Sequence, residues 1–303
     1  MINKKNILLT IILIIFIINS EVVISSTIEA TDLFINKVFM SIFPFIIFSN
    51  ILLYFNYNLF INKLLGKFFS KLFNISKNSI STFILSMLSS HPSNATFIKE
   101  KLDKNMIGIN EAEKIYSYTF FPSIMFVIGT IGINLLADIK SGFILLMCNY
   151  LCNIFIGFSL RNSFNNNYYN NYEENIKFND GSFFNALKES IINAINSSFI
   201  ILGNIVIFTI IINLIDVYIN ISPITSSVFY GLLEMTNGIV RVSNLNIDYN
   251  VKLFLISFLL NFSGLAIFFQ GSSIISPYKF NYKKILVRKL IFSLLFASIF
   301  LFI

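Results

Sequence analysis

Long apolar segments, many of them close to the length of a membrane span, alternate with short polar stretches along this chain. About 20 predominantly apolar residues are needed to cross a bilayer core of about 30 Å. The pattern therefore predicts an all-α polytopic membrane protein. The predicted spans are 7 to about 24, 33–57, 115–136, 141–160, a segment ending near 218, 253–275, and 285 to the end of the chain.

The first of these spans, Ile7–Ile18, follows two lysines and has the form of a signal peptide. No small-residue cleavage site follows it, so we interpret residues 1–31 as an uncleaved signal-anchor helix. Its basic flank predicts a cytoplasmic N-terminus. Glu21, Glu29 and Asp32 are then expected to form an acidic loop on the outer side.

Two further segments have polar centres and apolar arms too short to span. Ser79–Lys101 breaks at Ser89–Asn94 and has basic residues on both flanks, so both of its ends are expected in the cytoplasm. Pro223–Leu245 breaks at Glu234–Gly238 and has acidic flanks, so it is expected to enter from outside. Non-helical backbone at membrane depth is tolerated where it is buried in protein or faces water. Both segments are therefore predicted to be re-entrant helical hairpins.

Between the spans, Leu59–Phe73 alternates apolar residues with lysines at helical spacing, which is typical of a helix lying on the membrane surface. A polar stretch, 161–182, is predicted to be a cytoplasmic linker. It separates a first unit, 32–160, from a second, 183–303.

The two units resemble each other in opposite orientations. Three ordered matches carry the resemblance: Phe45–Ile51 with Phe199–Ile205, Ser89 with Glu234, and 121–123 with 262–264. Paired inverted repeats with broken membrane helices are a common plan of transporters. We therefore predict two inverted repeats, each with one re-entrant hairpin and broken transmembrane helices.

Composition agrees with a membrane protein, since 55% of the residues are hydrophobic and 12% are charged. Soluble domains carry about 25% charged residues. All but four of the 22 basic residues fall on the predicted cytoplasmic side, including the cluster 279–289. The four exceptions are Lys37, Lys140, Arg241 and Lys252. The net charge of +7 is thus explained by topology, and no nucleic-acid partner is predicted.

The chain offers little material for catalysis or cofactor binding. It has one histidine and two cysteines, without a metal-ligand spacing, so no cofactor and no metal are predicted. No Ser/His/Asp set and no phosphate-binding loop with a G-x-x-x-x-G-K-[ST] motif is present. We expect that the protein is not an enzyme and that gradients or a partner would drive any transport.

Four motifs resemble those of the YlbJ-type sporulation integral membrane proteins. They are SSHPSNA (Ser89–Ala95), FVIGTIG (Phe126–Gly132), GLLEMTNG (Gly231–Gly238) and SGLAIFFQGSS (Ser263–Ser273). Members of that family carry nucleoside-recognition Gate domains, distantly similar to concentrative nucleoside transporters. The resemblance implies a multi-pass protein of a bacterial cell membrane or forespore membrane that moves dipicolinate or a similar small solute.

Some positions depart from the family pattern. Ser90 and Asn94 stand where glycines are usual, and His91 replaces an aromatic residue. Phe120 and Phe268 likewise replace polar residues. These departures leave open a second hypothesis, a membrane scaffold of sporulation that transports nothing.

Glu234 is the strongest single candidate, because an intramembrane carboxylate is costly and usually functional. It could bind a coupling cation, carry a proton, or make a structural hydrogen bond. Thr236, Asn237 and Gly238 form a polar break whose exposed N–H groups could bind a carboxylate, or could simply turn the chain. Gln270 is a candidate substrate donor or acceptor.

The first hairpin offers mirrored candidates at its tip, where His91 could titrate near neutral pH or be incidental. The complete set of predicted substrate-binding residues is Ser89, Ser90, Asn94, Glu234, Thr236, Asn237, Gly238, Gln270 and Ser272. The expected partners are a small anionic or nucleoside-like solute and the lipid bilayer. A coupling cation or proton and a homo-oligomer are both compatible with this hypothesis.

Overall fold

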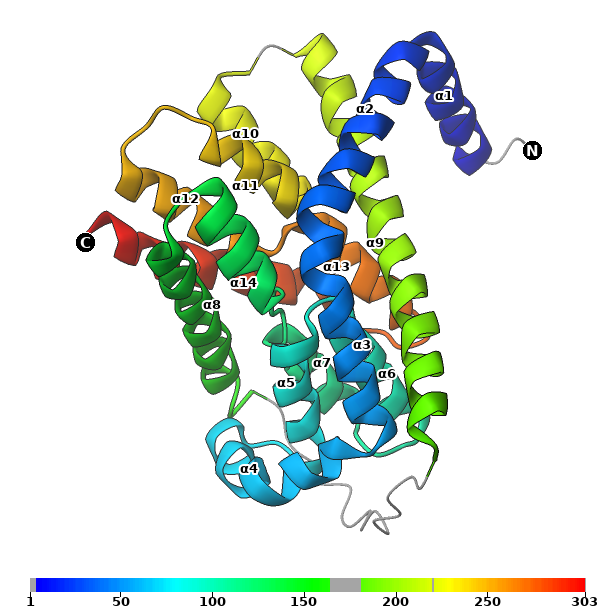
Figure 1. Ribbon diagram of the computed structural model, residues 1–303, viewed down its shortest axis with the longest axis vertical. Helices are drawn as coiled ribbons and strands as arrows, with labels where there is room; N and C mark the ends of the chain where they lie inside the picture. The colour runs from blue at the N-terminus through cyan, green and yellow to red at the C-terminus, as the bar shows by residue number, and fades with distance from the viewer. Residues whose placement is uncertain (1–3, 164–180, 220, 303) are drawn as a thin grey trace.

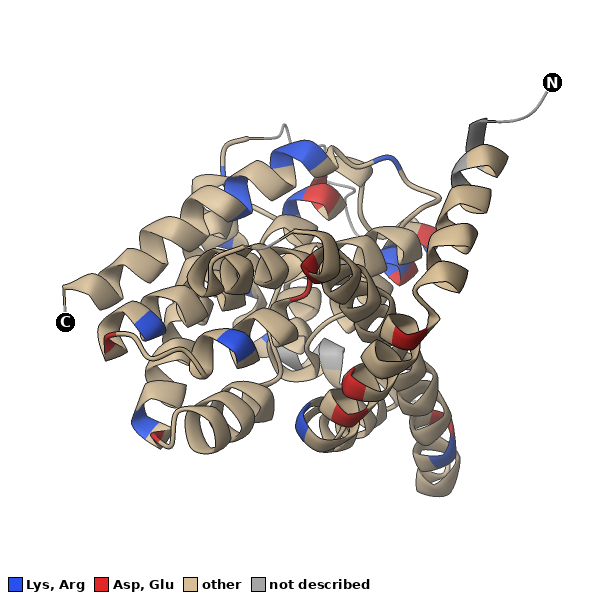
Figure 2. Cartoon of the chain, turned by 90° about the horizontal axis from the view of Figure 1, so that it is seen from above, with Lys and Arg blue, Asp and Glu red and all other residues tan. Residues whose placement is uncertain are grey.

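A computed structural model describes residues 4–163, 181–219 and 221–302. Every element in these ranges is helical. Most of the predicted linker 161–182 lies outside the described residues. Four helical segments are long and apolar enough to cross a membrane: Ser20–Tyr54, Ile139–Ser159, Phe183–Tyr218 and Tyr249–Ile274. Seen from above, most of the ribbon carries neither acidic nor basic residues (Figure 2). These features support a multi-pass membrane protein.

The N-terminal apolar run forms α1 (Lys4–Ile18), which ends at Asn19. The chain then continues as one long helical segment through α2 (Ser20–Leu33), the π-helical η1 (Phe34–Phe39) and α3 (Met40–Tyr54). The expected acidic loop is therefore wrong, because its residues lie in α2. Glu29 there accepts a hydrogen bond from Asn213 Nδ2 at 2.8 Å, so packing against a neighbouring helix accommodates the acidic residue.

The predicted surface helix is α4 (Tyr57–Phe73). Phe60, Leu64 and Phe68 lie one helical turn apart and are at least half exposed, which gives α4 an outward apolar stripe. Lys114 ties the end of this helix to the end of α8: its Nζ donates to the carbonyls of Asn74 at 3.0 Å and Arg161 at 3.2 Å. Burial lowers the pKa of Lys114 to about 8.

The rest of the first half contains two interruptions. The remaining elements are α5 (Lys77–Ser89), α6 (Ser93–Asp103), α7 (Ile109–Ser117), η2 (Phe126–Leu135) and α8 (Ile139–Ser159). The break between α5 and α6 falls at the predicted hairpin tip. The predicted span 115–136 is interrupted, since residues 119–123 are not helical. Pro122 lies in this stretch, where its lack of an N–H and the constraint on the preceding residue disfavour helix.

The second half has the same kinds of element. They are α9 (Phe183–Tyr218), α10 (Pro223–Leu233), α11 (Met235–Ser243), α12 (Tyr249–Phe262), α13 (Gly264–Ile274), α14 (Tyr282–Ala297) and η3 (Ser298–Leu301). The predicted span 253–275 is interrupted at Ser263, which adopts a positive φ of 73°. The chain turns there, so α12 and α13 are two helices rather than one.

Figure 1 shows how these elements are arranged. The segment α2–η1–α3 runs beside α9 along the length of the molecule. The pair α5/α6 occupies the end where α4 lies, and α10/α11 occupies the opposite end (Figure 1). Helix α13 lies between them and packs against both α6 and α10. The two helix pairs therefore approach the middle of the molecule from opposite ends.

Candidate functional site

The break in the second helix pair is built around Glu234. This residue is extended, with φ −136° and ψ 112°, and its carboxylate caps α11. Its Oε1 accepts from the N–H of Thr236 at 3.0 Å and its Oε2 from the N–H of Asn237 at 2.7 Å. A carboxylate at a helix N-terminus satisfies free N–H groups and faces the positive end of the helix dipole. Glu234 is only 2% exposed, so this capping provides its main stabilisation.

The break in the first helix pair spans Ser90–Pro92. Ser90 takes the left-handed φ of 62°, which ends α5, and His91 follows. His91 Nδ1 lies 3.3 Å from Asn94 Oδ1, and Asn94 Nδ2 donates to Thr119 Oγ1, also at 3.3 Å. Asn94 thereby connects this tip to the non-helical stretch 119–123. Two interruptions of the first half thus meet at one place.

The break between α12 and α13 packs directly against the second helix pair. Gly264 has a φ of +75°, and a Cβ at this position would lie 3.0 Å from the backbone nitrogen of Met235. Only glycine accommodates both that backbone conformation and that approach. Ser263 and Gly264 are thereby held next to Glu234 and Met235.

A cavity of about 70 Å³ lies where these breaks converge. Ser90 and His91 line it from one tip, and Glu234, Met235 and Thr236 line it from the other. The other lining residues are Val38, Ile42, Pro122, Ser123, Phe126, Ile201, Asn204, Ile205, Ser263, Ala266, Ile267 and Gln270. This volume holds a few water molecules. The cavity is mainly apolar, with polar groups at the breaks.

Two polar atoms at this cavity lack a hydrogen-bond partner among the described residues: His91 Nε2 and Gln270 Nε2. Gln270 is 5% exposed. An unpaired buried polar group is costly, and in a native protein it usually indicates a bound water, ion or ligand. The cavity therefore has the character of a binding site.

The predicted site residues divide into three groups. Ser90, Glu234, Thr236 and Gln270 line the cavity. Four others lie behind it and make structural contacts. Ser89 Oγ donates to the Leu85 carbonyl, Asn94 and Asn237 bind Thr119 and Thr209 through their side-chain amides, and Gly238 packs against Gly231. Ser272 lies apart from the cavity, and its Oγ donates to the Phe269 carbonyl.

Lys289 is the residue that the sequence interpretation placed wrongly. It was grouped with the cytoplasmic lysines, but it lies inside α14 and is 1% exposed. Its Nζ lies 3.5 Å from Ser263 Oγ and 3.9 Å from the centre of the Phe120 ring. Ile285 and Ser293, four residues to either side, are also buried, although the sequence alone does not show which face of this helix packs inward. This spacing places Lys289 on the buried face of the helix.

A second, larger cavity of about 350 Å³ lies among α3, α5, α6 and α9. Its lining is more polar and includes Asn50, Glu100, Lys101, Lys104 and Glu189. It lies at the end of the molecule occupied by the first helix pair. A polar chamber of this size can hold hydrated solutes.

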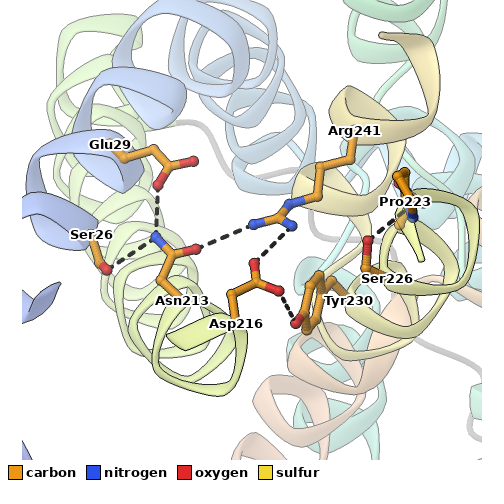
Figure 3. Close-up of polar contacts among 9 residues, drawn as sticks. Ser26, Glu29, Asn213, Asp216, Pro223, Ser226, Tyr230 and Arg241 are labelled. Atoms are coloured by element: carbon orange, nitrogen blue, oxygen red, sulfur yellow. Dashed lines mark hydrogen bonds and ion pairs between the residues drawn. The ribbon is translucent and has the colours of Figure 1, made fainter. Parts of the chain in front are cut away.

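At the opposite end, a polar cluster fastens the second helix pair to α9 (Figure 3). Arg241 of α11 pairs with Asp216 at 3.0 Å, donates to Asn213 Oδ1 at 3.2 Å, and lies 4.6 Å above the Tyr230 ring. Tyr230 of α10 also donates to Asp216. Asn213 extends the cluster to Glu29 of α2. We call these five residues the Arg241 cluster; they join four helices.

Among proteins of known name, the chain is similar to the sporulation integral membrane protein YlbJ of Bacillus subtilis (strain 168). The two are 21% identical over 288 residues, which cover 84% of this chain and 71% of the relative. No family model and no solved structure matches the chain. The chain is thus a distant homologue of a sporulation integral membrane protein, which supports the YlbJ-type resemblance of its motifs.

Proposed function

We propose that this protein is a sporulation-associated membrane permease for a small anionic solute such as dipicolinate. The cavity between the two helix-pair tips carries the proposal, because His91 Nε2 of one tip and Gln270 Nε2 of α13 line it without a hydrogen-bond partner among the described residues. In this proposal α5/α6 and α10/α11 are re-entrant hairpins that enter from opposite leaflets. The solute is held between their tips.

The order of elements favours an inverted repeat. A long helix comes first in each half, followed by a broken helix pair, an interrupted span and a last helix, and the first half has the additional helix α4 before its broken pair. The interruptions fall where the sequence matches align them, with Ser89 next to one break and Glu234 in the other. Likewise, Pro122 and Ser263 lie in the interrupted spans of the two halves. Half-sites from two such repeats would meet at a central site.

In this proposal the small central cavity corresponds to an occluded state. Pockets that hold drug-sized ligands measure about 300–1,000 Å³, so a solute of dipicolinate size needs the tips to move apart. In this proposal the polar chamber at the α5/α6 end is the approach from that side, and the Arg241 cluster closes the other side. We therefore infer that displacement of one hairpin relative to the other alternates access, with Glu234 as the candidate site for a coupling cation or proton.

Gln270→Ala and Glu234→Gln test the proposal. Uptake of labelled dipicolinate into proteoliposomes is expected to fall roughly 10-fold in each, since a lost hydrogen bond to a charged group costs about 1.5–3 kcal/mol. Gly203→Ala is the matched control, because nothing lies within 4 Å of the added methyl group. It should transport like the wild type. Wild-type uptake in both site variants would refute these roles.

The alternative is a sporulation membrane scaffold that transports nothing. Two observations favour it: Ser90 and Asn94 replace the expected glycines, and the central cavity is only about 70 Å³. The same proteoliposomes distinguish the two hypotheses. Absence of flux for the wild type under proton, sodium and solute gradients would favour the scaffold, provided that the protein is folded in the membrane.

A further inference from the structure

Lys289 is a buried lysine whose side-chain amine has few interaction partners among the described residues. An ammonium group has three N–H donors. Within the described residues, Lys289 Nζ makes one hydrogen bond, a long one of 3.5 Å to Ser263 Oγ, and one contact with the face of the Phe120 ring. It takes part in none of the ion pairs found there. Buried charges are normally paired, so this arrangement is costly to maintain.

Lys114 shows what a structural lysine looks like in the same protein. It is equally buried, at 0% exposure, but its Nζ donates to two carbonyl oxygens at 3.0 and 3.2 Å. These carbonyls lie at the C-terminal ends of α4 and α8, where a cation is favoured by the helix dipoles. Lys114 therefore has a packing role that Lys289 lacks.

Lys289 does not itself line the central cavity, but it lies one contact away from it. Ser263, its hydrogen-bond partner, lines that cavity. The His91 ring lies 4.8 Å from the Phe120 ring, so His91 and Lys289 flank the same aromatic residue. His91 Nε2 and Gln270 Nε2 add polar groups without partners at the cavity wall. Unused hydrogen-bonding capacity therefore gathers around one space, next to an unpaired positive charge.

We propose that Lys289 supplies the counter-charge for a carboxylate of the transported solute, with the side-chain amide of Gln270 donating a further hydrogen bond to it. This inference rests on the proposed function and specifies the chemistry of its site. A carboxylate has two oxygen atoms, which can accept hydrogen bonds from several donors that point toward the same place. The apolar wall formed by Val38, Ile42 and Phe126 suits the ring or chain that bears the carboxylate. The solute class is thus an organic acid with an apolar body.

The test uses the full-length protein in proteoliposomes, with labelled dipicolinate as the probe and Lys289→Met as the variant. Uptake is expected to fall at least 10-fold, while the melting temperature in detergent stays the same or rises because an unpaired buried charge is removed. Lys114→Met is the matched control. It should lower the melting temperature, since two partly buried carbonyls lose their donor, and leave uptake per folded protein close to that of the wild type.

A second comparison changes the solute instead of the site. Wild-type protein should carry dipicolinate at least 10-fold better than its uncharged diamide, and Lys289→Met should remove this preference. Equal transport of acid and diamide by the wild type would overturn the carboxylate site while leaving transport intact. So would unchanged acid uptake in Lys289→Met. If the wild type carries neither compound, the proposed function itself fails and the carboxylate site fails with it.

Discussion

At the scale of single residues, Gly231 and Gly238 determine how closely α10 and α11 pack against each other. A Cβ at Gly238 would lie 2.1 Å from Gly231 Cα and 2.7 Å from Gly231 N, both of which are backbone atoms. The arms α10 and α11 can approach this closely only if both positions lack a side chain. Gly238 was predicted to bind solute, but its geometry assigns it a packing role beside the site.

Gly238→Ala should therefore destabilise the protein by about 1–3 kcal/mol, the usual cost of overpacking a tight contact. Gly203→Ala places its methyl group in open space and should be neutral or slightly stabilising. Thermal unfolding in detergent measures both variants. A stability close to that of the wild type in Gly238→Ala would show that the two arms can separate at little cost.

Candidate site residues could be predicted from the sequence where a polar side chain lies within an apolar segment, because its burial in the membrane is costly. Glu234 and Gln270 stood out as polar residues within apolar segments, and both line the cavity. Lys289 was not recognised, because a lysine near other lysines at a helix start resembles a topology signal. Its burial depends on which face of α14 packs inward, and that is decided by the other helices.

Hairpin α10/α11 is held as an element by the Arg241 cluster, which joins it to α9 and, through Asn213, to α2. Arg241 and Asp216 are about one-third exposed, so their ion pair contributes little to global stability. The ion pair matters more for the position of the hairpin than for the stability of the fold. It fixes both arms of the hairpin relative to the longest helices of the protein (Figure 3).

Arg241→Gln is expected to loosen this hairpin without unfolding the protein. A cysteine at Thr236, in a background with Cys148 and Cys152 replaced by alanine, should then react several-fold faster with a membrane-impermeant maleimide added on the α10/α11 side. The melting temperature should change little, because partly exposed ion pairs contribute about 0–1 kcal/mol. Unchanged labelling would mean that the cluster does not control access. Lys252→Gln, which removes a different cation near this end, is the control.

Elements were predictable where polar residues interrupt an apolar pattern. Both hairpin breaks were placed in this way, at Ser89–Asn94 and Glu234–Gly238. Broken membrane helices are expected from the sequence, but the pattern does not fix the positions of the interruptions at 119–123 and at Ser263, whose neighbours are aromatic and apolar. Tertiary contacts decide those breaks: Asn94 binds Thr119, and Gly264 contacts Met235. Such contacts are not visible in local composition.

At the scale of the whole molecule, the basic residues of the sequence concentrate in the segments at the α4 end. Lys67 lies exposed on α4 at one end, and Asn246 lies exposed in the connection between α11 and α12 at the other. The basic bias predicts that the α4 end faces the cytoplasm. Helix α4 and the connection between α11 and α12 lie at opposite ends of the described structure (Figure 1), so one labelled position in each can test this orientation.

Single cysteines introduced at Lys67 and Asn246, in the same cysteine-free background, test this orientation. In right-side-out vesicles an impermeant maleimide should label position 246 at once and position 67 only after permeabilisation. A reversed pattern would invert the orientation. Labelling of both positions from one side would remove the basis for hairpins that enter from opposite leaflets.

The helical segment Ser20–Tyr54 has 35 residues and its neighbour α9 has 36. At about 1.5 Å per residue each is roughly 50 Å long, well beyond the 30 Å or so of a bilayer core. This side-by-side pair must lean strongly or extend past the lipid headgroups. Because α9 also anchors the Arg241 cluster, a change in bilayer thickness would alter the lean of the pair and with it the fit of the α10/α11 hairpin. The proposed transport activity would then depend on the lipid composition of the host membrane.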